Sequence, residues 1–182
     1  MNAQTFVQYR RKREGRTNYK KRLALLKSHA PRLALRKTNK HLVAQLITYA
    51  PDGDRVLLGV TSKALEKLGW AYSAKNLPAA YLTGYLLGRK AKATGAARAI
   101  VDLGLHTPVR GSRIYALLKG AQDAGLQIPA DAAVLPSPER LRGDHIVAYA
   151  ARARPPQFAK TVRLQALPET IAAVKAAIDK LQ

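Results

Sequence analysis

The sequence predicts an α/β protein: an antiparallel three-strand meander followed by βαβα, giving a mixed sheet with helices packed on it. A basic N-terminal arm precedes this core and a helical C-terminal extension follows it. Three observations predict this class. Short apolar segments between residues 32 and 61 are separated by polar turns, as in β-hairpins. From residue 78 the apolar residues recur at helical spacing. Of 182 residues, 47% are hydrophobic, which is typical of a globular chain despite a formal net charge of +21.

The arm is predicted from charge. Thirteen lysines and arginines and a single acid, Glu14, lie in the first forty residues. Because such a charge density repels itself, we expect that it cannot be buried and that it binds a polyanion. Phe6, Tyr9 and Tyr19 are interleaved with the cations, and aromatic rings can stack on bases while guanidinium groups contact phosphates. The pattern favours a nucleic-acid arm over a solvated tail, with a helix within residues 19–27.

Three strands are expected at residues 32–37, 41–49 and 55–61, joined by tight turns at 37–40 and 51–54. In the first strand, Leu33 and Leu35 alternate with Arg32, Ala34 and Arg36, so the two sets lie on opposite faces. Short turns between successive strands predict an antiparallel meander.

Two helices and two short strands are expected next. Pro78 suits the start of a helix that ends near Gly95, and Gly84 and Gly88 along it would allow close approach to the sheet. Residues 99–103 form a buried strand, Ser112 caps a second helix that ends at Gly125, and residues 126–128 return as a short strand. The apolar stripes of the two helices consist of Tyr81, Leu82, Tyr85 and Leu86, and of Ile114, Leu117, Leu118 and Ala121.

The tail is predicted to begin at Pro136, Ser137 and Pro138. A helix over residues 139–151 is followed by a break at Pro155 and Pro156 and by a last helix from Pro168, with Ile171, Val174, Ile178 and Leu181 on one stripe. We therefore expect a basic arm at residues 1–30, an α/β core at 31–135 and an extension at 136–182, packed on the core or on a partner.

The sequence contains no motif typical of catalysis or cofactor binding. There is no cysteine, no Walker-type loop and no Gly-x-Gly-x-x-Gly, and the four histidines lack the spacings of metal sites. We therefore expect no catalytic residue, no cofactor, no metal and no small-molecule substrate. No apolar run is long enough to cross a membrane, and there is no secretory signal. A transit peptide is disfavoured because Ser28 is the first serine.

Two segments are candidate sites for RNA. Residues 104–113 follow a strand and lead into a helix, where free N–H groups beside Arg110 and Arg113 would suit a phosphate; an ordinary capped loop is the equal alternative. The hairpin at residues 36–41 offers cations for phosphates, and Thr38 and Asn39 for base edges or 2′-hydroxyls. A solubilising turn is the less favoured alternative there.

Several stretches closely resemble a known family. They are RRKREG at 10–15, YKKRLALL at 19–26, PRLALRKTNKHLVAQ at 31–45, PAAYLTGYLL at 78–87, DLGLHTPVRGSRIYALLKGAQDAGLQIP at 102–129 and RLRGDHIVAY at 140–149. In this order they resemble archaeal-type large-subunit ribosomal protein eighteen, the universal 5S rRNA-binding family, whose eukaryotic counterpart is large-subunit protein five. The match covers roughly residues 10–150 and weakens beyond Arg154.

The resemblance implies a cytoplasmic, non-enzymatic constituent of the large ribosomal subunit. It would bind 5S rRNA and help attach it to the large rRNA in the central protuberance, beside neighbouring proteins that include the other 5S rRNA-binding protein. The implied RNA-binding residues are Tyr9, Arg10, Arg11, Lys12, Arg13, Arg16, Tyr19, Lys20, Lys21 and Arg22 in the arm, Arg36, Lys37, Thr38, Asn39, Lys40 and His41 in the hairpin, and His106, Thr107, Arg110, Ser112 and Arg113 in the loop.

Two other classes stay open on the residues alone. An RNA-directed modifying enzyme or nuclease with a basic docking arm would need a convergent cluster of acids or histidines, for which the sequence gives no evidence. A basic architectural DNA-binding protein fits the charge, but the interleaved aromatic residues suit exposed bases better than a duplex groove.

Overall fold

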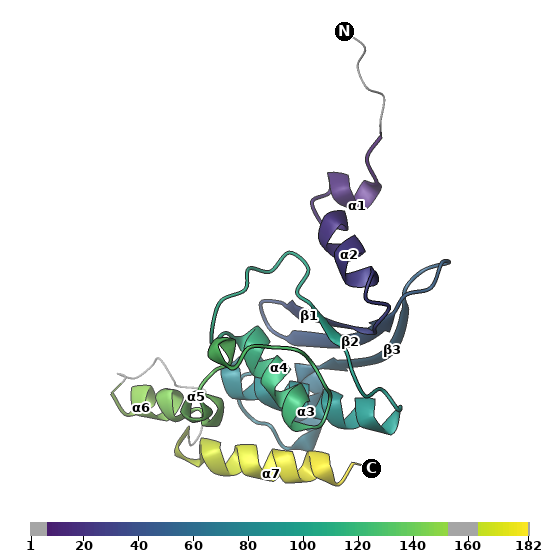
Figure 1. Cartoon of the computed structure of the whole chain (residues 1–182). Coiled ribbons are helices and arrows are strands. Elements are labelled where there is room, and N and C mark those ends of the chain that lie inside the picture. Colours follow the sequence, from purple (N-terminus) through teal and green to yellow (C-terminus); the bar gives the residue numbers. More distant parts are fainter. Residues whose placement is uncertain (1–6, 153–163, 182) are drawn as a thin grey trace.

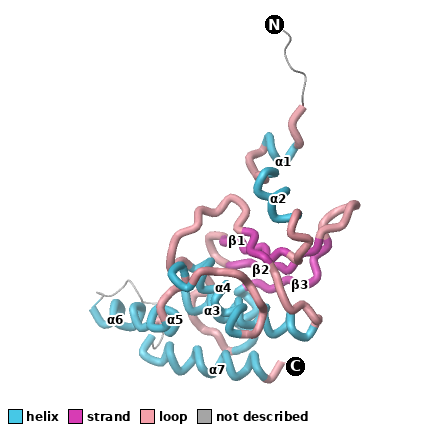
Figure 2. The backbone as a smooth tube through the Cα atoms, in the orientation of Figure 1, coloured by secondary structure: helices cyan, strands magenta, loops and turns pink. Residues whose placement is uncertain are grey.

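The computed structural model describes residues 7–152 and 164–181 (Figure 1). One sheet, of four strands, lies between the N-terminal arm on one side and the helical body on the other (Figure 2). The predicted break at Pro155 and Pro156 lies outside the described residues.

The sheet is mixed, as predicted. Its order is β3-β2-β1-β4, with β1 antiparallel to β2, β2 antiparallel to β3, and β1 parallel to β4. Leu33, Leu35, Leu42, Ala44 and Leu46 are at most 1% exposed and form the sheet side of the core. The strands are β1 (Arg32–Lys37), β2 (Leu42–Thr48), β3 (Arg55–Thr61) and β4 (Ile100–Asp102).

Helices α3 (Leu77–Ala93) and α4 (Arg113–Asp123) pack on each other and cover one face of the sheet. Asn76 begins α3 by accepting a hydrogen bond from the Ala79 N–H at 2.8 Å. The sequence suggested that Gly84 and Gly88 of α3 allow close approach to the sheet, but they face α4 instead. A Cβ on Gly84 would collide with the backbone carbonyl of Leu117, so the close approach is between α3 and α4.

Three features between and after these helices differ from expectation. A 3-10 helix, η1 (Ser62–Leu68), which the sequence did not predict, follows β3. Residues 126–128 do not form a strand and make only a single parallel bridge, between Arg98 and Gln127. The expected single helix at 139–151 is two helices, α5 (Pro138–Arg142) and α6 (Asp144–Arg152), because Gly143 adopts a left-handed conformation with φ of 79°.

The C-terminal helix α7 (Leu167–Asp179) packs against α3. Leu167, Ile171, Val174 and Ile178 are buried, but Leu181 lies beyond the helix and is 49% exposed, so its assignment to the apolar stripe was wrong. The remaining short 3-10 helices are η2 (Ala132–Val134) and η3 (Leu164–Ala166). The domain boundaries themselves stay predictions.

Candidate nucleic-acid interface

The basic arm rises from the body as two short helices, α1 (Arg10–Arg13) and α2 (Tyr19–Leu26) (Figure 1). The Asn18 side chain begins α2 by accepting from the Lys21 N–H at 3.0 Å. The rings of Tyr9 and Tyr19 meet with centroids 5.0 Å apart, which joins the two segments. Phe6 lies outside the described residues. The predicted RNA-binding cations whose side chains are exposed here are Arg10, Arg11, Lys12, Arg13, Arg16, Lys20 and Lys21.

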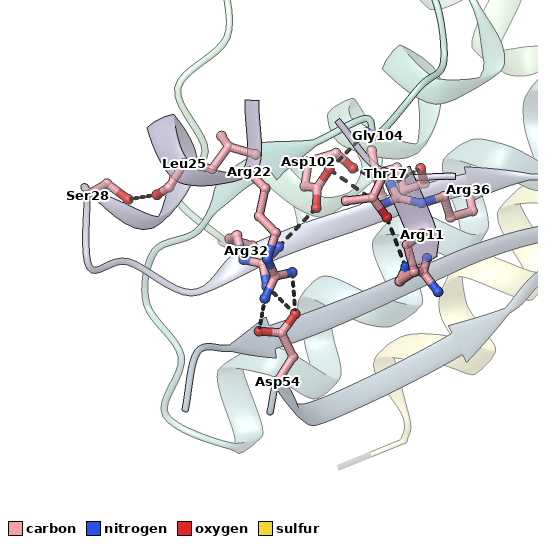
Figure 3. A network of polar contacts seen from close by, with 11 residues as sticks. Arg11, Thr17, Arg22, Leu25, Ser28, Arg32, Arg36, Asp54, Asp102 and Gly104 are labelled. Atoms are coloured by element: carbon pink, nitrogen blue, oxygen red, sulfur yellow. Dashed lines mark hydrogen bonds and ion pairs between the residues drawn. The ribbon is translucent and has the colours of Figure 1, made fainter. Parts of the chain in front are cut away.

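The arm is attached to the sheet by a bidentate ion pair. Arg22 of α2 donates to both carboxylate oxygens of Asp54, at 2.7 and 2.8 Å, and Arg32 of β1 donates to the same carboxylate at 2.6 Å (Figure 3). The hydrogen bond from Arg22 is the main reason that the pKa of Asp54 lies below its usual value, and the same bond raises the pKa of Arg22.

The pairing continues across the sheet. Arg32 also donates to Asp102 of β4 at 3.2 Å, and Arg36 approaches Asp102 at 3.4 Å while donating to the Asp102 backbone carbonyl at 2.7 Å. Positive and negative groups therefore alternate through Arg22, Asp54, Arg32, Asp102 and Arg36, which we call the ion-pair chain. It connects α2, the turn before β3, β1 and β4.

The ion-pair chain corrects one expectation drawn from charge. Arg32 belongs to the basic segment that we expected to stay unburied, yet it is 2% exposed, because two carboxylates neutralise it. Arg22 and Arg36 are both predicted RNA contacts, and both already donate hydrogen bonds inside the protein, to Asp54 and Asp102 respectively. Their contact with RNA stays a prediction. Sequence reasoning missed the roles of Asp54 and Asp102, because no local spacing indicates which acids meet which cations in three dimensions.

The β1–β2 hairpin presents its tip to solvent. Thr38 closes the turn: its N–H and its hydroxyl both donate to the His41 carbonyl at 2.8 Å, and its hydroxyl oxygen accepts from the His41 N–H at 2.9 Å. The Thr38 side chain is therefore structural, whereas Lys37, Asn39 and Lys40 are exposed. The imidazole of His41 is half-buried, and its Nδ1 has no hydrogen-bond partner among the described residues.

His106 joins the two segments that the sequence treated as separate sites. Its Nε2 accepts a hydrogen bond from the backbone N–H of Lys37 at 3.2 Å. Burial lowers the pKa of His106, and the charges of Lys37 and Arg36 lower it further, so the ring is neutral at pH 7 and can accept. The loop after β4 is thereby held against the base of the hairpin.

The rest of that loop differs in detail from a simple phosphate site. Thr107 and Arg110 are exposed, and Ser112 occupies the N-cap position of α4 as predicted, but its side chain makes no capping hydrogen bond. Arg113 donates to the backbone carbonyl of Lys75 at 3.0 Å, so it also braces the start of α3. Phosphate binding by this loop stays a prediction.

The three predicted segments converge on one surface. A cavity above the sheet is lined by Arg11 and Tyr19 from the arm, by Arg36 from β1 and by His106 from the loop. Among residues 7–152 and 164–181, no three His, Asp or Glu side chains lie close enough together to hold a metal ion. Within the same ranges, no helix is long and apolar enough to cross a membrane.

Comparison with known proteins gives a consistent result. Residues 4–95 match the family described as "Ribosomal large subunit proteins 60S L5, and 50S L18". The chain is also similar to "Large ribosomal subunit protein uL18" of Korarchaeum cryptofilum (strain OPF8), with 50% identity over 146 residues, which are 80% of this chain and 75% of that protein. The relative is a structural protein of the ribosome, and its family is not enzymatic. The chain therefore belongs to the family of ribosomal large subunit proteins 60S L5 and 50S L18.

Proposed function

We propose that this structural constituent of the large ribosomal subunit binds 5S rRNA and helps attach it to the large rRNA in the central protuberance. The observation that carries the proposal is the convergence of the arm, the hairpin and the loop on one face of the molecule, where His106 and the ion-pair chain hold them together. Family membership places the protein in the large subunit of cytoplasmic ribosomes.

The proposal divides the RNA-contacting work between these segments. The exposed cations of α1 and α2 neutralise phosphates, which supply affinity without sequence preference. Tyr9 is 68% exposed and offers a ring for base stacking. Asn39, at the exposed hairpin tip, has an amide suited to a base edge or a 2′-hydroxyl.

We further propose that residues 1–30 act as the RNA-binding arm and 31–135 as the core that orients it. Residues 136–182, whose last helix packs on α3, then face rRNA or neighbouring large-subunit proteins, including the other 5S rRNA-binding protein. These residues carry eight lysines and arginines and four acids, a net charge of +4, which is compatible with either kind of partner.

The experiment is filter binding of the purified protein to 5S rRNA over a salt series. If about eight phosphates are neutralised, log K should fall against log salt with a slope of roughly −6 to −7. Unrelated structured RNA and duplex DNA of matched length serve as competitors. A flat salt response, or equal affinity for all three nucleic acids at moderate salt, would overturn the proposal.

A further inference from the structure

The arm and the body enclose a cavity of about 820 Å³, bounded on one side by α2 and the segment before it and on the other by the sheet and the loop after β4. Its size falls in the range of sites that hold one small organic molecule. Figure 3 shows the ion-pair chain that forms its floor. Its lining includes six lysine and arginine side chains: Arg11, Arg16, Lys21, Arg22, Arg32 and Arg36.

The charge of the lining selects an anion. Six cationic side chains face two carboxylates, Asp54 and Asp102, and both carboxylates are already engaged by arginines. Arg32 is 2% exposed and lies in the floor of the cavity. Arg11, Arg16 and Lys21 are exposed, so their charges are accessible to an anion bound in the cavity.

The lining is also partly apolar and aromatic. Tyr19 contributes a ring, and Leu25, Ile47 and Leu105 contribute aliphatic surface from three separate parts of the chain. An inorganic anion would use none of this surface. A nucleotide uses both the cationic and the apolar surface, because its base stacks on rings and apolar groups while its phosphate pairs with arginine and lysine.

We propose that this cavity holds one unpaired nucleotide of an RNA strand, with its base between Tyr19 and the apolar residues and its phosphate among Arg11, Arg16 and Lys21. The inference rests on the proposed function and deepens it, because it assigns a local RNA structure, a single extruded nucleotide, to a specific place. The arm then reads an unpaired position rather than only following the phosphate backbone.

The test compares two short RNA duplexes that differ only in one unpaired nucleotide. The wild-type protein should bind the bulged duplex about tenfold more tightly, as expected for one stacked base. Leu25→Trp, which fills the cavity from α2, should abolish that preference. Leu23→Trp is the matched control, because Leu23 lies on the same helix, is 60% exposed and does not line the cavity.

A second measurement does not depend on how the tryptophan packs. The chain has no cysteine, so Leu25→Cys provides a single thiol in the cavity. The bulged duplex should slow its alkylation by a maleimide, and the paired duplex should not. Equal protection by both duplexes, or a bulge preference that survives Leu25→Trp, would overturn the proposal. If GMP or inorganic phosphate alone protected the thiol as well as the bulged RNA, the cavity would be a free-ligand site and the RNA assignment would be wrong.

The two proposals fail in different ways. If the wild-type protein showed no bulge preference but did select 5S rRNA, this inference alone would be overturned. A bulge preference without selectivity for 5S rRNA would overturn the proposed function and leave the cavity assignment standing.

Discussion

Two aspartates determine how three arginines of the basic segment are used. Asp54 and Asp102 hold Arg22, Arg32 and Arg36 in fixed positions, so these cations serve the fold, while the exposed cations of α1 and α2 face solvent. Because Arg32 is buried, removing one of the two acids that neutralise it should cost more than removing an acid whose partner lies in water.

Asp54→Asn should lower the free energy of unfolding by about 2 kcal/mol at pH 7. The pKa of Asp54 in the folded protein lies below its ordinary value of 3.8. Its stabilisation is therefore present above that value and is lost as the pH falls through the lower, folded pKa. Urea unfolding at pH 7 and near pH 3 measures both effects. Asp52→Asn, in the same turn and exposed, is the control and should change little. A deficit for Asp54→Asn that stays constant down to pH 3 would contradict this assignment.

His106 should act as a hydrogen-bond acceptor only when neutral. Its pKa lies below the ordinary 6.5, so the stability that it supports is full above pH 6.5 and declines as the pH falls towards the folded pKa. In an NMR titration, the Lys37 amide resonance should shift over this range in the wild type. His106→Gln keeps an acceptor without a titration and should abolish the shift. An identical shift in the variant would show that another group titrates.

At the scale of elements, α3 and α4 pack on each other and support the sheet, to which the arm is attached. Their contact depends on three glycines: Gly84 and Gly88 of α3 face the backbone of α4, and Gly120 of α4 faces the backbone of α3 at Tyr81. The helices therefore approach more closely than side chains would allow.

Gly84→Ala should destabilise the protein by about 3 kcal/mol, because the added methyl group meets a backbone carbonyl that cannot move aside. Urea unfolding is the measurement. Gly59→Ala is the control: its Cβ would lie 3.8 Å from the Gln45 side chain, an ordinary contact, and we expect a change within about 0.5 kcal/mol. Equal effects of the two substitutions would refute the close-packing explanation.

The hairpin is the element expected to give selectivity. Asn39→Ala should weaken binding to 5S rRNA by roughly tenfold and binding to unrelated structured RNA by much less, because an amide reads specific groups. Lys40→Ala, at the neighbouring exposed position, should weaken both RNAs alike by removing a phosphate contact. Filter binding to the two RNAs measures this. If Asn39→Ala weakened both equally, the hairpin would position the RNA without reading it.

At the scale of the whole molecule, the sequence predicted the local elements better than the long-range contacts between them. The meander, the two core helices and the last helix follow from turn residues and apolar spacing, and the structure has them. The burial of Arg32, the contact of His106 with Lys37 and the pairing of Gly84 with α4 join residues far apart in the sequence, and spacing along the chain carries no signal for them. Similarly, one left-handed glycine, Gly143, divided a helix that periodicity alone predicted as continuous.

The cations of the arm should account for a defined share of the salt dependence of RNA binding. Replacing Arg10, Arg11 and Arg13 together with Ala should weaken all RNA binding and make the slope of log K against log salt less negative by about 2 to 3. The control replaces Lys63, Lys67 and Lys90, three exposed cations of η1 and α3 outside the basic segments, and should leave the slope unchanged. Equal changes in both triple variants would show that only net charge matters.

The central claim is that this basic surface selects 5S rRNA, and RNA capture tests it most directly. Immobilised full-length protein is incubated with total ribosomal and transfer RNA at roughly 0.3 M salt, where non-specific phosphate binding is weakened. The bound RNA is then sequenced. We predict strong enrichment of 5S rRNA over its input share, and loss of that enrichment when Arg10, Arg11, Arg13 and Asn39 are all replaced by Ala. Recovery of RNAs in proportion to their input abundance would contradict the account.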